Sequence, residues 1–155
     1  MNKNDKQKRV FTSNKITENI DFLFDDLWPQ MHSRETARGS CYDNLVTIVE
    51  KFNKFQTDFN LLLASLTALD GLGLVISTGL IFAAYPNSAV PFDKYTMGFA
   101  LFNKILSTSK ISNNQYIVAC YNVLNFIENH ITINSIHDFV LAANCLDRML
   151  AKDPM

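Results

Sequence analysis

The sequence lacks an excess of charge of either sign. Its 14 lysine and arginine residues stand against 15 aspartate and glutamate residues, which gives a formal net charge of −1. A protein that binds nucleic acid tightly usually carries a clear basic excess, so this balance argues against a general basic face. Residues 1–15 differ, because five basic residues against one acidic residue give +4 and leave −5 for the rest. We predict a flexible basic tail over 1–15 and a single domain over 16–155.

Cysteine and histidine are scarce, with three of each. No Cys-x-x-Cys pair occurs, and three thiolates cannot supply the four ligands of a usual iron–sulfur cluster. The histidines lack metal-ligand spacing, and no Walker loop, dinucleotide fingerprint or His-Glu-x-x-His motif is present, so no cofactor or metal is predicted. We expect the cysteines to be buried thiols of a reduced, cytoplasmic protein. These six residues are Cys41, Cys120, Cys145, His32, His130 and His137.

A hydrophobic run long enough to cross a membrane is also missing. The continuous apolar stretch over 72–85 has 14 residues, and a spanning helix needs about 20. The N-terminus is polar and has no apolar core of a signal peptide. We therefore expect no membrane span; the alternative is a membrane hairpin with arms 59–69 and 72–85.

Apolar residues recur at helical spacing along nearly the whole chain, without sustained strand-like alternation. The fold class predicted is all-α, a compact bundle of about seven helices containing one helix-hairpin-helix element. Three starts are marked by capping boxes at Ser40, Ser112 and Ser135. Residues 30–39 and 86–92 are predicted loops. The predicted helices cover 17–27, a segment from 40 through 52, 57–69, 74–85, 94–107, 112–129 and 135–151.

The sequence Leu69-Asp70-Gly71-Leu72-Gly73 joins two predicted helices. Glycine permits a positive φ angle and close approach of another backbone. The second helix then begins with unpaired N–H groups and the positive end of its dipole, which suits an anion. We predict that this turn binds a DNA phosphate through Gly71, Leu72, Gly73 and Val75. Such contacts position a duplex without reading its sequence.

These residues resemble the helix-hairpin-helix DNA glycosylase superfamily, the endonuclease III-like enzymes, over about residues 57–107. Gly71 and Gly73 match the glycines of the family turn, and Asp93 lies 22 positions after the first of them, at the spacing of the family's catalytic aspartate. The resemblance implies binding of double-stranded DNA and hydrolysis of an N-glycosidic bond, with Asp93 as catalytic residue acting on a flipped-out base. Asp70 replaces the family's proline. Val75 replaces the lysine of members with lyase activity, so no lyase step is expected.

Two alternatives accompany this reading. Asp93 also suits the N-cap of the next helix, accepting the backbone N–H of Tyr95 or Thr96. The alternative function is a non-catalytic protein–protein interaction module or a homodimer, in which the turn only connects two packed helices. Four basic residues have two possible roles, a basic edge beside the turn that would favour DNA binding, or a solvated face without a function. They are Arg34, Arg38, Lys51 and Lys54.

Overall fold

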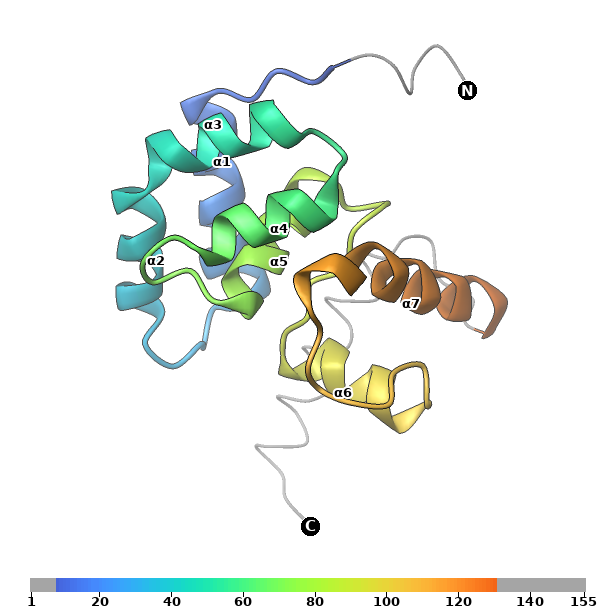
Figure 1. The fold of residues 1–155 in the computed structure, drawn as a ribbon. Helices are drawn as coiled ribbons and strands as arrows, with labels where there is room; N and C mark the ends of the chain where they lie inside the picture. The colour runs from blue at the N-terminus through green and yellow to red at the C-terminus, as the bar shows by residue number, and fades with distance from the viewer. Residues whose placement is uncertain (1–7, 131–155) are drawn as a thin grey trace.

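A computed structural model of the chain describes residues 8–130. Within this range every regular element is helical, so the predicted all-α class is confirmed (Figure 1). Helices α1 to α5 form one group, and α6 and α7 lie to one side of it. The predicted helix over 135–151 lies outside the described residues. The α-helices are α1 Ser13–Asp21, α2 Arg34–Asp43, α3 Leu45–Phe55, α4 Phe59–Thr67, α5 Leu74–Ala84, α6 Lys94–Phe102 and α7 Tyr116–His130.

The first helix begins inside the predicted basic tail. Thr12 caps α1 by accepting the backbone N–H of Lys15 through its hydroxyl at 3.2 Å. Phe11 is buried in the core, so an apolar anchor precedes the helix and moves the start of the domain toward the N-terminus. The helix continues as a π-helical segment, η2 Phe22–Leu27. The predicted apolar face is confirmed, since Ile20, Leu23, Phe24 and Leu27 are buried.

Residues 9–11 are held on α3 by two side-chain amides. The Gln56 amide bonds the backbone N–H and C=O of Arg9, and the Asn53 amide does the same for Phe11, at 2.7–2.9 Å. The Arg9 guanidinium donates to the Ala84 carbonyl at 2.6 Å, at the C-terminal end of α5. Arg9 is therefore bound within the fold, although the sequence places it in a flexible tail.

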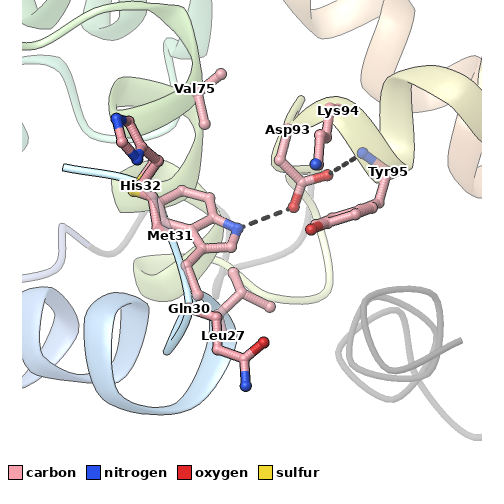
Figure 2. Close-up of a pocket in the computed structure, with 9 residues that line it drawn as sticks. Leu27, Gln30, Met31, His32, Val75, Asp93, Lys94 and Tyr95 are labelled. Atoms are coloured by element: carbon pink, nitrogen blue, oxygen red, sulfur yellow. Dashed lines mark hydrogen bonds between the residues drawn. The ribbon is translucent and has the colours of Figure 1, made fainter. Parts of the chain in front are cut away.

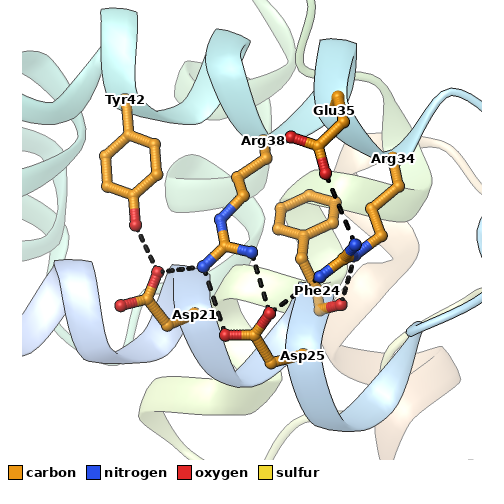
Figure 3. Close-up of polar contacts among 7 residues, drawn as sticks. All are labelled: Asp21, Phe24, Asp25, Arg34, Glu35, Arg38 and Tyr42. Carbon is orange, nitrogen blue, oxygen red and sulfur yellow. Dashed lines mark hydrogen bonds and ion pairs between the residues drawn. The ribbon is translucent and has the colours of Figure 1, made fainter.

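Helix α2 corrects the sequence prediction, which makes residues 30–39 a loop and begins a helix at Ser40. The Ser40 hydroxyl lies in the last part of α2 and donates to the Thr36 carbonyl, so it caps nothing. Ion pairs with α1 and η2 hold α2 in place, as Figure 3 shows. Arg38 pairs with both Asp21 and Asp25, and Arg34 pairs with Asp25, at N–O distances of 2.7–2.8 Å.

These ion pairs involve two of the four residues of the possible basic edge, Arg34 and Arg38. Two arginines one helical turn apart face two carboxylates on α1 and η2, and the Tyr42 hydroxyl also donates to Asp21. Arg38 and Arg34 together lower the pKa of Asp25 through hydrogen bonds and Coulomb attraction, so the carboxylate stays charged. The charge of Arg34 and Arg38 is thus neutralised within the fold.

Helix α5 is the centre of the group, as its apolar sequence predicts. Its residues 76–82 are all buried, and α4 and α1 pack against it. Gly79 allows a further close contact, with the residue that follows η2, because a Cβ there would lie 2.4 Å from Cη2 of Trp28. Glycine at this position therefore lets the indole of Trp28 lie directly on the α5 backbone.

Helices α6 and α7 lie where the sequence predicts helices, but α6 ends earlier and α7 begins later than predicted. Helix α6 ends at Phe102 rather than Ser107, and Lys104 just beyond it has a φ of 58°. The predicted capping box at Ser112 is not formed, because the Ser112 hydroxyl donates to the Asn114 side chain instead. A short 3₁₀ turn, η3 Asn113–Gln115, leads into α7.

Cys41 and Cys120 are buried free thiols, as predicted. Burial raises the pKa of each to about 12, so both stay protonated and unreactive at neutral pH. Cys145 lies outside the described residues. Among residues 8–130, no helix has the length and apolar character that crossing a bilayer requires.

Candidate functional site

The turn between α4 and α5 contains two glycines with different structural roles. Gly71 has a φ of +81°, and a Cβ there would lie 2.4 Å from the Ser40 hydroxyl, so both the backbone and α2 require glycine. Gly73 has an ordinary φ of −84° and forms the N-cap of α5. Leu72 between them is buried and anchors the turn. Asp70 is exposed, and its carbonyl accepts from the Asn44 side chain at 3.1 Å.

The N-terminus of α5 has no side-chain cap, because glycine supplies no oxygen for one. A Cβ on Gly73 would meet no atom within 4 Å, so packing does not demand glycine here. The first-turn N–H groups of α5, which include that of Val75, receive no capping bond from Gly73. This is the arrangement that the sequence predicts for a phosphate contact, and Asp70 adds one negative charge to the same turn.

Asp93 is the N-cap of α6, as one of the two sequence readings predicts. Its Oδ1 accepts the backbone N–H of Tyr95 at 3.1 Å and of Thr96 at 2.8 Å. Its Oδ2 accepts the indole Nε1–H of Trp28 at 2.9 Å. The side chain is 3% exposed, so three N–H donors hold a nearly buried carboxylate in one orientation. The catalytic role remains a prediction.

A cavity of about 380 Å³ opens beside this carboxylate (Figure 2). Val75 from the first turn of α5 and Asp93 from the start of α6 both line it, so the structure brings two of the predicted site residues together. Gly71, Leu72 and Gly73 are not among the lining residues. The lining consists of Leu27, Trp28, Gln30, Met31, His32, Val75, Asp93, Lys94 and Tyr95.

The segment from Leu27 to His32 was not predicted to be functional. In the sequence, Trp28 and Pro29 only follow the predicted helix over 17–27, and His32 is one of three histidines without metal-ligand spacing. The one available signal was compositional, since Trp28 is the only tryptophan of the chain. The partner that gives Trp28 its place, Asp93, lies 65 residues away.

The side chains that line the cavity are of two kinds, apolar or aromatic and charged or polar. Trp28, Tyr95 and Met31 provide aromatic and polarisable surface, which suits a flat ring. His32 and Lys94 are both exposed, and both line the cavity (Figure 2). The Lys94 ammonium lies 5.0 Å from the centroid of the Tyr95 ring. The lining therefore combines apolar and aromatic side chains, one buried carboxylate, and the exposed side chains of His32 and Lys94.

Within residues 8–130, no group of three histidine, cysteine, aspartate or glutamate side chains is placed to hold a metal ion. Neither a family model, nor a curated protein, nor a solved structure matches this chain.

Proposed function

We propose that this protein binds DNA, with a backbone phosphate at the α4–α5 turn and an unstacked base in the cavity beside Asp93. The observation that carries the proposal is that Val75 and Asp93 line the same cavity. A strand whose phosphate contacts the first turn of α5 can therefore place a neighbouring ring against Trp28. The predicted phosphate ligands are the backbone groups of Gly71, Leu72, Gly73 and Val75.

The charge of the protein determines what kind of DNA binding this is. With Arg34 and Arg38 held by Asp21 and Asp25, few basic side chains remain near the site. Binding then depends on backbone amides and on the cost of exposing a base, which is lowest for an unpaired or damaged nucleotide. We expect weak, salt-sensitive binding that favours duplexes with a mismatch or an abasic site.

Base excision is the catalytic form of this proposal. The Asp93 carboxylate would stabilise positive charge that develops on the sugar or would activate water. Val75 has no amine and forms no Schiff base with an opened sugar, so the reaction would be hydrolysis alone.

Replacement of Gly73 by aspartate tests the phosphate contact. An aspartate at this N-cap accepts the first-turn N–H groups itself and repels a phosphate, so DNA affinity should fall at least tenfold. The fold should gain about 0.5–1 kcal/mol, because the new side chain caps α5 and restricts the unfolded chain. Fluorescence anisotropy with a mismatched duplex at low salt measures the affinity, and thermal unfolding measures the stability.

The matched control is Gly73→Ser, which caps the helix without a charge. It should stabilise the fold similarly and weaken DNA binding less than aspartate does. Absence of DNA binding by the unaltered protein at low salt would contradict the proposal. Equal affinities of the unaltered protein and Gly73→Asp would contradict the phosphate contact at this turn.

A second candidate function, self-association, is favoured by one face of α7. Ile117, Val118 and Tyr121 are 42%, 60% and 67% exposed, and no charged residue occurs between 116 and 127. An uncharged apolar row can pair with its own copy without charge repulsion. If it does, light scattering should show a dimer that Tyr121→Lys converts to a monomer. A monomer at high concentration before substitution would exclude this candidate.

A further inference from the structure

We propose that the groove between the end of α6 and the C-terminal half of α7 binds a phosphate group through Lys104, Asn122 and Asn125. The groove has a volume of about 270 Å³ and shares no lining residue with the cavity beside Asp93. It therefore lies outside the site that is proposed for DNA. The lining residues with polar side chains are Asn103, Lys104, Asn122, Asn125 and His130.

The part of the chain that forms the groove is nearly free of acidic residues. Residues 94–127 contain three lysines and no aspartate or glutamate, whereas residues 16–93 contain four basic and ten acidic residues. Glu128 is the one acidic residue of α7. It is two positions from both Phe126 and His130, so it lies about 200° round the helix from these two lining residues. No carboxylate lines the groove to repel an anion.

Lys104 occupies a backbone position that usually takes glycine. Its φ is 58°, and it directly follows Asn103, the C-cap of α6. Its N–H bonds the Leu101 carbonyl at 3.1 Å, and the next N–H, of Ile105, bonds the Ala100 carbonyl at 2.8 Å. These two bonds form a Schellman motif, in which glycine is preferred because it has no Cβ. The fold therefore gives no reason for a lysine at this position.

The charge of Lys104 is not neutralised within the described part of the chain. Lys104 is exposed and forms no ion pair there, unlike Arg34 and Arg38, which are paired with aspartates. A lysine ammonium binds phosphate as a point charge with three N–H donors. The Lys104 side chain is thus available to an anion in the groove that it lines.

Two side-chain amides of α7 add uncharged donors to the same groove. Among residues 8–130, the Asn122 side chain has no hydrogen-bond partner, and Asn125 accepts a bond from Asn129 without donating one. Asn122 and Asn125 are three residues apart, so they lie on the same face of α7. Lysine and asparagine side chains both bind phosphate oxygens in protein–DNA complexes. One ammonium and two amides therefore suit one phosphate group.

Titration of the full chain with inorganic phosphate at constant ionic strength tests this assignment, with heteronuclear NMR as the readout. The backbone signals of residues 103–105 and 122–130 should shift and saturate, whereas chloride should leave them unchanged. Lys104→Gly should lower the phosphate affinity about tenfold, the effect of losing one charge-assisted hydrogen bond. The same variant should unfold at a higher temperature, because glycine suits the positive φ. Reduced binding by a more stable protein cannot result from unfolding.

Lys110→Gln is the matched control, because Lys110 is an exposed lysine of the same acid-free stretch that does not line the groove. It should leave the phosphate affinity unchanged. Asn122→Asp places a carboxylate in the groove and should abolish binding. Unaltered affinity in Lys104→Gly or Asn122→Asp would overturn the assignment, as would signal shifts that spread over all lysines without saturating.

Titration with a DNA duplex distinguishes the two sources of a phosphate group. Competition between the duplex and inorganic phosphate, with shifts of the same signals, would support the site and identify a DNA strand as the source. DNA binding that leaves both these signals and phosphate binding unaffected would support a site for a small phosphate compound. Absence of any DNA binding would contradict the proposed function, but phosphate binding in the groove would still uphold this inference.

Discussion

Replacement of Asp93 by alanine is expected to lower the free energy of unfolding by about 3 kcal/mol. The loss has two parts, because the carboxylate serves two elements at once. Removing an N-cap costs about 1 kcal/mol, and leaving the buried indole N–H of Trp28 without an acceptor costs about 1–3 kcal/mol. Chemical denaturation followed by circular dichroism gives the total, with the denaturant slope unchanged if the native core stays compact.

Two further substitutions divide this loss between its parts. Asp93→Ser retains a capping oxygen for Tyr95 and Thr96 but is too short to reach Trp28, so it should recover about 1 kcal/mol relative to alanine. Trp28→Phe removes the indole donor from the other side. If the hydrogen bond couples the two positions, the double variant will be more stable than the sum of the single losses predicts. Additive losses would show that the bond contributes nothing to stability.

Asp93→Asn addresses the proposed chemistry without removing the side chain. The amide oxygen can cap α6, but the amide NH₂ then faces the Trp28 N–H, so a moderate loss of stability is expected. Release of a base from damaged DNA, if the protein catalyses it, should disappear in this variant while tryptophan fluorescence still reports a folded protein. Undiminished release would exclude Asp93 as the catalytic residue.

The fold follows from local sequence wherever a helix has a one-sided apolar pattern. The buried faces of η2 and α4 are predicted correctly, because Leu23 and Leu62 recur with their neighbours at helical spacing and become buried. Helix α5 is apolar almost all round, and its predicted central place is also confirmed. Helix α2 is missed because its sequence is polar and has almost no apolar stripe. Its arginines find their partners on α1 and η2, and this distant pairing is absent from any local window.

The candidate site likewise has features that local sequence predicts and features that depend on distant contacts. The cap at Asp93 and the glycine at position 71 are predicted, since a cap and a positive φ are local properties. The cavity is not, because it depends on bringing residues 27–32 against the starts of α5 and α6. Val75 shows the difference, because the sequence assigns it a backbone contact and the structure also places it in the cavity wall.

Gly79 is the position where stability and the site are most closely linked. An alanine there would place its Cβ 2.4 Å from Cη2 of Trp28 and 3.2 Å from Cδ2 of Leu23. Forcing a methyl group into a packed core costs about 1–3 kcal/mol, against a gain of up to about 1 kcal/mol from better helix propensity. We expect a net loss of about 1–2 kcal/mol and a displaced indole.

Gly98→Ala is the control, because Gly98 lies within α6 and a Cβ there meets no atom within 4 Å. That variant should gain up to about 1 kcal/mol, so the two alanine substitutions should move the unfolding midpoint in opposite directions. Gly79→Ala should also shift the Trp28 emission and weaken DNA binding, since the indole can no longer both lie on α5 and donate to Asp93. In a Trp28→Phe background, alanine at position 79 should be tolerated, because the clashing ring edge is gone. A Gly79→Ala protein with unaltered stability, emission and binding would show that the position of the indole does not depend on this contact.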